Sequence, residues 1–335
     1  MKLLTLCTAA YNVESSIGAM IQSVVESGDI DKIELIIIND GSTDSTGHVV
    51  SSFLEKYPES IIYIEKENGG SGSARNIGIA KASGVYFKIL DGDDKMDSQG
   101  LHKLIQCLEA EPADLILTKC ITLKGNTEVR TNQWKGISIG SVVSMDDIPL
   151  NMDFQMHYMS IKTSILQNNH ILLTEGISYV DTEYVAYTLP YIKTVLVEDY
   201  VVYMYYVGME TQSMSINNCF KKKHQMERIT LNIAKYYLKF FEPGKISAQK
   251  RKLLETILLN RYIYTLELYL KDKNSKYADY TTFDKEFCAV SNFIKEISDR
   301  HPYIRRVRMH QYMLYPLMHT YRVVKFGIYR WMKGE

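Results

Sequence analysis

The sequence lacks the features that mark several classes of protein. Its 335 residues include 39 basic and 39 acidic side chains, so the net charge is zero, whereas a nucleic-acid-binding protein is usually basic. The five cysteines are odd in number and contain no CxxC pair, which argues against a disulfide framework or a zinc site and favours reduced thiols. No run reaches the roughly 18 apolar residues of a membrane-spanning helix, and Tyr11 and Asn12 interrupt the N-terminal apolar run too early for a signal peptide. These absences predict a cytoplasmic protein without a nucleic-acid partner.

The first hundred residues alternate apolar strands with amphipathic helices. Four segments have the apolar character of buried strands: residues 3–9, 33–38, 61–64 and 85–90. This alternation predicts an α/β fold, with a mostly parallel sheet and helices on both faces. Three polar clusters follow the predicted strands directly: residues 11–12, 40–44 and 91–94. Ligands bind beyond the carboxyl ends of the strands in such sheets, so the sequence predicts a binding site there.

Asp91-Gly92-Asp93-Asp94 ends the fourth apolar strand. Two carboxylates one residue apart, Asp91 and Asp93, can share a hard cation such as Mn²⁺ or Mg²⁺. The cation would neutralise the charge of a departing diphosphate. The segment also fits an ordinary acidic turn, because aspartate and glycine both favour turns.

A glycine-rich loop precedes a predicted helix at residues 68–76. Glycines allow the backbone to approach a ligand, the helix N-terminus favours anions, and Arg75 can pair with phosphate. The loop has neither the Walker pattern nor GxGxxG, so a nicotinamide oxidoreductase is excluded. A flexible connection between strand and helix is the alternative interpretation.

Asp40 follows the second strand and can accept hydrogen bonds from a base or a ribose. Ser42, Thr43 and Asp44 are good helix-capping residues. One of these three is expected to cap the next helix, which leaves Asp40 free for a ligand.

Four segments together resemble the family 2 glycosyltransferases in order and spacing. They are residues 8–14 (TAAYNVE), 38–44 (INDGSTD), 68–78 (NGGSGSARNIG) and 90–94 (LDGDD). The resemblance implies a GT-A fold, with a nucleotide-sugar-binding half (residues 1–112) and an acceptor-binding half (113–215). A C-terminal helical region, residues 216–335, would follow this catalytic domain.

The resemblance also implies an inverting reaction, in which a sugar moves from a nucleoside diphosphate sugar, most often a UDP-sugar, to an acceptor hydroxyl. The acceptor would be a saccharide, or be linked to lipid or protein, in the synthesis of a bacterial-type surface polysaccharide or glycoconjugate. Asp91 and Asp93 would form the metal-binding DxD motif, with Mn²⁺ or Mg²⁺ as cofactor. The implied nucleotide-sugar site comprises Ala9, Tyr11, Asn12, Glu14, Asp40, Asn68, Gly70, Arg75, Asp91 and Gly92.

Inversion requires a base that takes the proton of the acceptor hydroxyl. In the family this base is usually the aspartate of a Glu-Asp pair, and here Val180 replaces the glutamate before Asp181. Asp181 is the predicted base and Glu183 the runner-up, although Asp181 could instead cap a helix. Gln212 and Ser213 match a QS segment that lies near the diphosphate in one branch of the family, and are weaker candidates for the acceptor or diphosphate site.

Two other functions remain open. The Val180 departure is compatible with a catalytically impaired, transferase-like partner subunit. A metal-dependent nucleotidyltransferase would also use a carboxylate-bound metal on an α/β domain. That enzyme would need a glycine-rich phosphate loop after the first strand, and residues 9–14 contain no glycine.

The C-terminal tail has charge of one sign only. Residues 300–334 contain eight lysines and arginines and no acidic residue. Apolar residues recur at helical spacing: Leu314, Leu317, Tyr321, Val324, Ile328 and Trp331. A basic amphipathic helix can lie on an anionic membrane surface, which would place the protein on the inner face of the cell membrane. The same pattern fits a helix packed on the catalytic domain or on a partner subunit.

Overall fold

The computed structural model describes residues 1–110, 112–125, 127–208, 216–242, 244–308, 312 and 315–333, with only the backbone for residues 326–333. The chain divides into two compact units. The first comprises Met1–Met209 and Ser247–Lys250, and the second comprises Glu210–Ile246 and Arg251–Glu335. In the described ranges, no helix has the length and apolar character required to cross a bilayer.

The first unit is built on a ten-stranded sheet with the order β3-β2-β1-β4-β9-β6-β10-β5, in which β7 pairs with β6 and β8 with β10. Its strands are β1 (Leu4–Ala10), β2 (Ile33–Asp40), β3 (Ile61–Lys66), β4 (Tyr86–Ile89), β5 (Lys95–Met96), β6 (Leu115–Lys124), β7 (Thr127–Thr131), β8 (Val142–Ser144), β9 (Met159–Lys162) and β10 (Thr194–Tyr206). β2 is buried along its whole length, as its β-branched sequence requires for a central parallel strand.

The sheet changes from parallel to mixed along its width. β1 pairs in parallel with β2 and β4, and β2 with β3. β9 then pairs antiparallel with both β4 and β6, whereas β6 and β10 are parallel. The predicted α/β fold is confirmed, and its later strands continue the same sheet across the expected boundary at residue 112.

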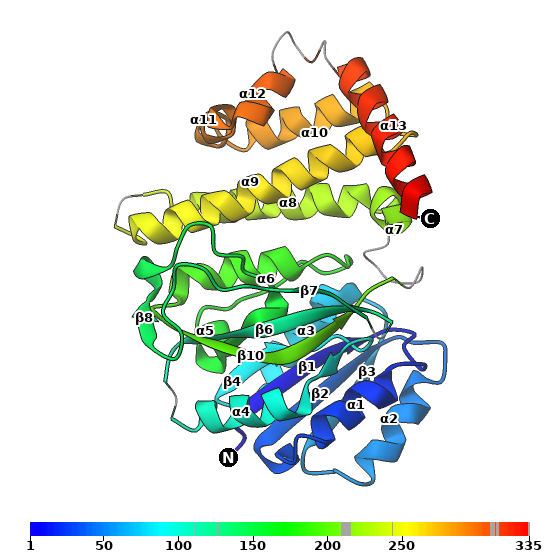
Figure 1. The fold of residues 1–335 in the computed structure, drawn as a ribbon, viewed down its shortest axis with the longest axis vertical. Helices are drawn as coiled ribbons and strands as arrows, with labels where there is room; N and C mark the ends of the chain where they lie inside the picture. Colours follow the sequence, from blue (N-terminus) through cyan, green and yellow to red (C-terminus); the bar gives the residue numbers. More distant parts are fainter. Residues whose placement is uncertain are drawn as a thin grey trace. The chain divides into compact units, whose positions relative to one another are not determined.

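Helices cover both faces of this sheet. On one side α1 contacts both α2 and α4, and on the other α3 packs on β1 and β2 and contacts α5 (Figure 1). The helices of this unit are α1 (Ile17–Val25), α2 (Thr46–Leu54), α3 (Gly70–Lys81), α4 (Ser98–Leu108), α5 (Thr163–Asn168) and α6 (Asp181–Thr188). α3 and α6 begin at the edge of the sheet where the parallel strands end, which brings their first residues to the predicted site.

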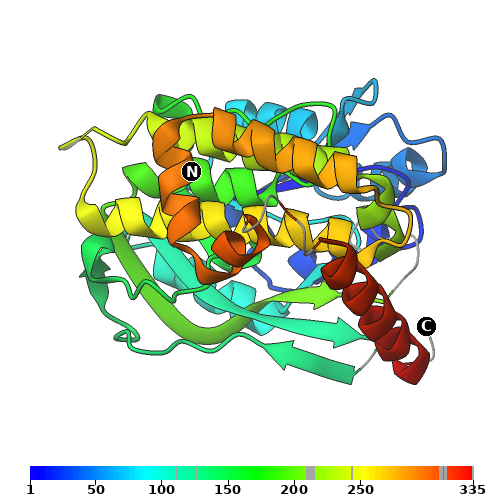
Figure 2. The same ribbon diagram turned by 90° about the horizontal axis from the view of Figure 1, so that it is seen from above.

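The second unit consists of helices. These are α7 (Ile216–Lys221), α8 (Lys223–Leu238), α9 (Ala248–Lys271), α10 (Tyr277–Ala289), α11 (Asn292–Arg300), α12 (Pro302–Arg308) and α13 (Tyr315–Lys333). The long α9 runs beside α8 and α10 in both views (Figures 1 and 2). The core of this second unit contains stacked aromatic rings: Tyr262 of α9 stacks on Phe287 of α10 at 3.9 Å between ring centroids.

α13 presents two different faces. Tyr315 packs against Tyr280, and Arg322 donates to Glu267 at 2.9 Å, so this face is attached to α9 and α10. The predicted apolar stripe faces away from them: Leu317, Tyr321 and Val324 are 71%, 60% and 55% exposed. The described part of the stripe is therefore not the packing face of the helix.

Candidate active site

The polar residues that follow the parallel strands converge at one edge of the sheet. β1 lies between β2 and β4 and runs parallel to both, so the carboxyl ends of the three strands are neighbours. Tyr11 follows β1, Asp40 ends β2, and Asp91 comes two residues after β4. The sheet thus brings together motifs that are up to 80 residues apart in the sequence.

Arg75 connects two carboxylates that the sequence separates by 90 positions. Its guanidinium donates to Oδ1 of Asp91 at 2.9 Å through Nη2, and to Oδ1 of Asp181 through Nη1. The Arg75 side chain is only 4% exposed, whereas Asp91 is 26% and Asp181 41% exposed. The predicted base and the first carboxylate of the DxD motif are therefore held side by side, with surface left for a ligand.

The charge of Arg75 is maintained by these two partners. Burial alone would lower its pKa, but the negative charges of Asp181 and Asp91 outweigh burial and raise the pKa above its usual value. Nε of Arg75 has no hydrogen-bond partner among the described residues. The guanidinium is thus a fixed positive charge between two accessible carboxylates.

Asp181 and Glu183 differ completely in their surroundings. Asp181 is the first residue of α6, and Val180, which has no side-chain capping bond, occupies the cap position. The expected alternative of Asp181 as the cap residue is therefore not observed. Glu183 is fully buried, and it accepts hydrogen bonds from the amide and hydroxyl of Thr174, at 2.9 and 2.7 Å. Glu183 fastens the chain before α6, and of these two carboxylates only Asp181 is open to solvent.

Asp40 is not free, contrary to the sequence-based expectation. It is buried, and its Oδ1 accepts from Nζ of Lys66 at 2.6 Å and from the amide of Gly69 at 2.9 Å. The side-chain amide of Asn68 donates to the backbone carbonyl of Asp40 at 2.9 Å. Asp40 therefore fixes the glycine loop beside β2. The expected cap is also not observed, because Ser45 rather than Ser42, Thr43 or Asp44 occupies the cap position of α2, without a side-chain capping bond.

The glycine loop has little room for side chains. Gly70 is the first residue of α3 and has a φ of +79°. A Cβ on it would lie 2.8 Å from the backbone of Ile177. The loop consequently packs against the segment that leads into α6, which is how α3 and α6 come close enough for the Arg75–Asp181 contact.

The segment after β1 is fastened to the start of α2. Asn12 has a φ of +52°, and its Oδ1 accepts from the amide of Thr43 at 2.8 Å. Glu14 accepts from the amide of Ser45 at 2.7 Å. Tyr11 is exposed, while Ala9 lies within β1. Asn12 and Glu14 thus shape the loop, and Tyr11 is the side chain of this segment that can reach a ligand.

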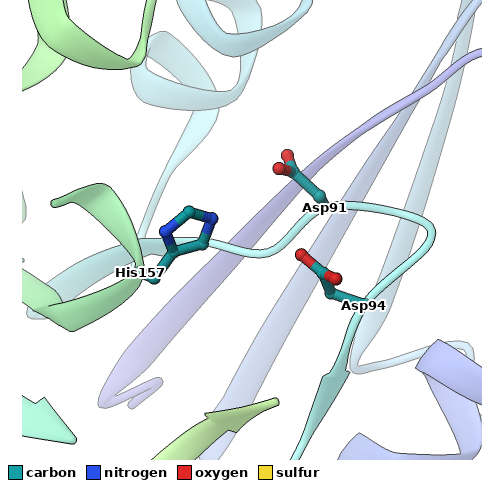
Figure 3. Close-up of side chains that lie close together, drawn as sticks. All are labelled: Asp91, Asp94 and His157. Atoms are coloured by element: carbon teal, nitrogen blue, oxygen red, sulfur yellow. The ribbon is translucent and has the colours of Figure 1, made fainter. Parts of the chain in front are cut away.

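A second cluster lies directly beside the first. Within the described ranges, the side chains that could converge on a metal ion are Asp91, Asp94 and His157, with ligand atoms within 4.8 Å of one another (Figure 3). Figure 3 shows Asp91 and Asp94 on the turn after β4, with the imidazole facing them from another segment. The cluster includes Asp91, as predicted from sequence, but Asp94 and His157 rather than Asp93. Gly92, in the same turn, accepts from Ser16 at 2.9 Å.

Burial controls the charges in this second cluster. Burial, and then the neighbouring Asp91 and Asp93, raise the pKa of Asp94 well above its usual value. Burial lowers the pKa of His157, so the imidazole is neutral at pH 7. Asp94 accepts from the hydroxyl of Tyr203 at 2.7 Å and from the amide of Tyr206 at 2.8 Å.

Sequence reasoning missed three of these residues. Asp94 belongs to a motif that was recognised, but the predicted metal pair was Asp91 and Asp93. Lys88 is a charged residue inside an apolar strand, which was a visible signal; it is fully buried, and its Nζ donates to the carbonyl of His157 at 2.6 Å. Burial lowers the pKa of Lys88 to about 7. His157 had no signal in the sequence, since a lone histidine in an irregular segment has no pattern.

Two of the predicted site residues, Gln212 and Ser213, lie outside the described residues.

Comparisons with known proteins agree with these motifs. Residues 5–169 match the family model described as glycosyl transferase family 2. The minor teichoic acid biosynthesis protein GgaB of Bacillus subtilis is 40% identical over 85 residues, which is 25% of this chain and 9% of GgaB. Glycosyltransferase GlyA of Streptococcus pneumoniae is 33% identical over 112 residues, 33% of this chain and 16% of GlyA. The matches thus span less than a fifth of these two relatives.

The fold has a close counterpart among solved structures. Residues 1–349 of S. aureus TarS, in complex with UDP-GlcNAc, superpose with a TM-score of 0.69 at 18% identity, covering 100% of this chain and 93% of that one. The likeness concerns the fold, because the identity is low. The fold is therefore of the GT-A type, and residues 5–169, just under half of the chain, match the family 2 glycosyltransferases.

Proposed function

We propose that this protein is an inverting, metal-dependent glycosyltransferase that moves one sugar from a nucleoside diphosphate sugar to an acceptor hydroxyl. The observation that supports this most is the Arg75 bridge, which holds the half-exposed Asp181 beside Asp91 at the strand ends. A general base must reach the proton that it removes. Asp181 meets this condition, and the buried Glu183 does not.

In the proposed reaction the acceptor oxygen attacks the anomeric carbon as the bond from that carbon to the diphosphate oxygen breaks. The acceptor proton passes to Oδ2 of Asp181, because Arg75 occupies Oδ1. Attack from the face opposite the leaving group inverts the anomeric configuration. A bound divalent cation would stabilise the negative charge of the departing diphosphate. Arg75 holds Asp181 in position throughout, which contributes through orientation.

The residues of the site fit such a cation. Asp91 and Asp94 supply the carboxylate oxygens that Mn²⁺ and Mg²⁺ prefer, and both lie on one turn. Asp93 remains the second carboxylate of the proposed DxD motif. The exposed fraction of Asp91, 26%, allows contact with a diphosphate.

The donor we propose is a UDP-sugar, and the acceptor is a growing cell-surface glycopolymer of the teichoic acid type. The donor is supported by the fold shared with TarS, whose structure contains UDP-GlcNAc. The acceptor class is supported by the likeness to GgaB, a teichoic acid biosynthesis protein. Tyr11, exposed at the end of β1, is the side chain that we expect to stack on the base.

A panel of nucleotide sugars tests this proposal. With Mn²⁺ present, one UDP-sugar should be hydrolysed slowly and transferred to acceptor faster, and excess chelator should stop both reactions. Asp91→Asn should stop them as well, while Asp153→Asn, an exposed aspartate paired with Arg130, should have no effect. If calorimetry with Mn²⁺ shows no binding of uridine, guanosine or thymidine diphosphate, the nucleotide-sugar function is refuted.

We further propose that α13 attaches the protein to an anionic membrane surface. Leu317, Tyr321 and Val324 form an exposed apolar stripe, and the adjoining Lys325 is exposed too. Arg305 and Arg306 on α12 add exposed positive charge. Apolar insertion and attraction to anionic lipid act together in such helices, and salt weakens the second.

Vesicle sedimentation tests the membrane proposal. The protein should sediment with phosphatidylglycerol vesicles and much less with phosphatidylcholine vesicles, and high salt should release it. A Leu317→Ser/Tyr321→Ser/Val324→Ser variant should lose binding but keep donor hydrolysis. Leu172→Ser, which removes an equally exposed leucine from the first unit, is the matched control. Unchanged sedimentation of the triple variant would overturn the proposal, as would a stripe that instead supports a dimer in analytical ultracentrifugation.

A further inference from the structure

His157 is a buried polar side chain without a partner. Both Nδ1 and Nε2 are inaccessible to solvent, and neither has a hydrogen-bond partner among the described residues. Leaving a buried polar atom unpaired costs about 1–3 kcal/mol, and such atoms are rare in native proteins. An imidazole with both nitrogens unpaired therefore calls for a ligand that this chain does not itself provide.

The imidazole is held in a fixed position. Its ring packs against Tyr203 at 4.8 Å and against Tyr205 at 4.7 Å between centroids. Nζ of Lys88 donates to the backbone carbonyl of His157 at 2.6 Å. Contacts on both the ring and the backbone prevent His157 from turning away to find another partner.

Asp94, on the facing turn, is oriented in the same manner. The hydroxyl of Tyr203 donates to its Oδ2 and the amide of Tyr206 to its Oδ1. Each carboxylate oxygen has two lone pairs, so one on each remains for a further bond. Both described partners are neutral groups, yet Asp94 is 1% exposed. Buried carboxylates are usually paired with a cation or bound to a metal.

Both facing residues share one support. Tyr203 lies against the His157 ring, donates to Asp94, and its oxygen also accepts from the amide of Asp91 at 3.1 Å. Metal ligands are commonly oriented by such outer hydrogen bonds. The three side chains thus belong to one rigid arrangement, with ligand atoms within 4.8 Å of one another (Figure 3).

We propose that His157 is a nitrogen ligand of the divalent cation, completing with Asp91 and Asp94 a site of mixed oxygen and nitrogen donors. This inference rests on the proposed metal-dependent transfer and adds a ligand that lies 63 positions beyond Asp94 in the sequence. Imidazole nitrogen is a ligand for first-row transition metals, the series that Mn²⁺ begins, whereas Mg²⁺ keeps to carboxylate, phosphate and water oxygens. His157 therefore makes the site selective against Mg²⁺.

Metal binding, measured independently of turnover, tests the role of His157. Mn²⁺ and Mg²⁺ are titrated into the full chain with saturating UDP, with free Mn²⁺ followed by electron paramagnetic resonance and Mg²⁺ by calorimetry. His157→Phe keeps a ring between the two tyrosines. It should weaken Mn²⁺ binding by at least about 10–100-fold, the loss usual for mutation of residues that only support a metal ligand, and Mg²⁺ binding by much less. His48→Gln, which removes an exposed imidazole from α2, should leave both dissociation constants unchanged.

A spectroscopic measurement on the unaltered protein covers the case in which the variant fails to fold. Pulsed electron paramagnetic resonance of the Mn²⁺ and UDP complex should show coupling to a histidine nitrogen, and ¹⁵N-histidine labelling should change that coupling. Absence of the coupling, or equal Mn²⁺ affinity of His157→Phe and wild type, would overturn the inference.

The same titrations separate this inference from the proposed function. If Asp91→Asn abolishes Mn²⁺ binding while His157→Phe retains it in full, metal-dependent transfer stands and the histidine ligand is refuted. If wild type with UDP binds neither Mn²⁺ nor Mg²⁺, the metal-dependent function is refuted together with it.

Discussion

Arg75 in the first unit and Arg308 in the second each bind two aspartates, with side chains 4% and 11% exposed, and they differ in the exposure of those aspartates. Arg308 contacts Asp284 through Nε and Nη2 and Asp299 through Nη1. Asp284 is 1% exposed and also accepts from the hydroxyls of Tyr262 and Tyr312. Asp284 is thus shut off from solvent, with its charge satisfied inside the protein, whereas Asp299, at the rim of the Arg308 cluster, is 41% exposed.

The Arg75 cluster is open by comparison. Asp91 and Asp181 are 26% and 41% exposed, and Nε of Arg75 has no partner among the described residues. A cluster without a fully buried carboxylate gives less stability than one built around Asp284, but both of its carboxylates can contact a ligand. The same residue types therefore serve structure in one unit and, as we propose, chemistry in the other. Four predictions test this difference.

The largest expected effect concerns the base. Asp181→Asn should slow transfer to acceptor by about 10²–10⁴, the usual range for general-base catalysis, and leave donor binding and the melting temperature close to wild type. Asp299→Asn is the matched control, because Asp299 is also 41% exposed and bound to a buried arginine. Steady-state kinetics should show no loss for that variant. An equal loss in both variants would contradict the distinction between the two clusters.

Stability should depend more on Arg308 than on Arg75, which is the reverse of the order expected for activity. Arg308→Met leaves Asp284 buried without its cation, which should lower the free energy of unfolding of the second unit by about 3–5 kcal/mol. Arg75→Met should cost less, because water can reach Asp91 and Asp181. Hydrogen exchange measures the two units separately. A larger loss of protection around Arg75 than around Arg308 would contradict the comparison.

The third prediction compares the two carboxylates of α6 in the candidate site, the buried Glu183 and the exposed Asp181. Glu183→Gln weakens the bonds from the amide and hydroxyl of Thr174 and should lower the free energy of unfolding by about 1–3 kcal/mol. Transfer by the folded protein should fall less than in Asp181→Asn. Denaturant unfolding and kinetics on the same samples give both quantities. If Glu183→Gln slows transfer more than Asp181→Asn does, Glu183 is the base.

The smallest effect is a pH dependence in the second unit. Burial, and then the charges of Glu286 and Asp279, raise the pKa of Glu227 to about 7 from its usual 4.5. A raised pKa favours the protonated form in the folded state. The associated stability is therefore complete below pH 4.5 and is lost as the pH rises through 7.

Glu227→Gln should accordingly stabilise the protein at pH 8 by about 1 kcal/mol, a figure reduced for the partial exposure of this side chain. No gain is expected at pH 4.5. Melting temperatures of both proteins from pH 4.5 to 8 measure the difference. A gain that is the same at both pH values would refute the assigned pKa.

Much of the fold could be predicted from local patterns. The apolar run of residues 33–38 gave a strand that the structure extends to Ile33–Asp40, since a continuous β-branched segment is stable mainly in a buried parallel sheet. β6 lies beyond the four strands predicted in the first hundred residues, and its second half, up to Lys124, pairs with both β7 and β10. That pairing depends on a partner strand rather than on the sequence of β6.

In the candidate site, too, some residues could be predicted from the sequence and others could not. Asp91, Arg75 and Asp181 were each predicted, and the structure brings them together. Asp40 was expected to be free, yet Lys66 and Gly69 bind it. Both partners come from the next strand and loop, so their approach could not be inferred from spacing within the motif.

The sequence by itself determined the alternation of strands and helices in the first hundred residues and the polar clusters at the strand ends, because these depend on periodicity and local turn chemistry. The motifs in those clusters also carried the resemblance to the family 2 glycosyltransferases. Only the tertiary structure decided that Arg75 joins Asp91 to Asp181, that Glu183 is buried, and that His157 faces Asp94. Each of these contacts joins residues from different segments and depends on burial. A side chain's charge, partners and access to ligand are set by its neighbours in space, and these neighbours exist only once the sheet has formed.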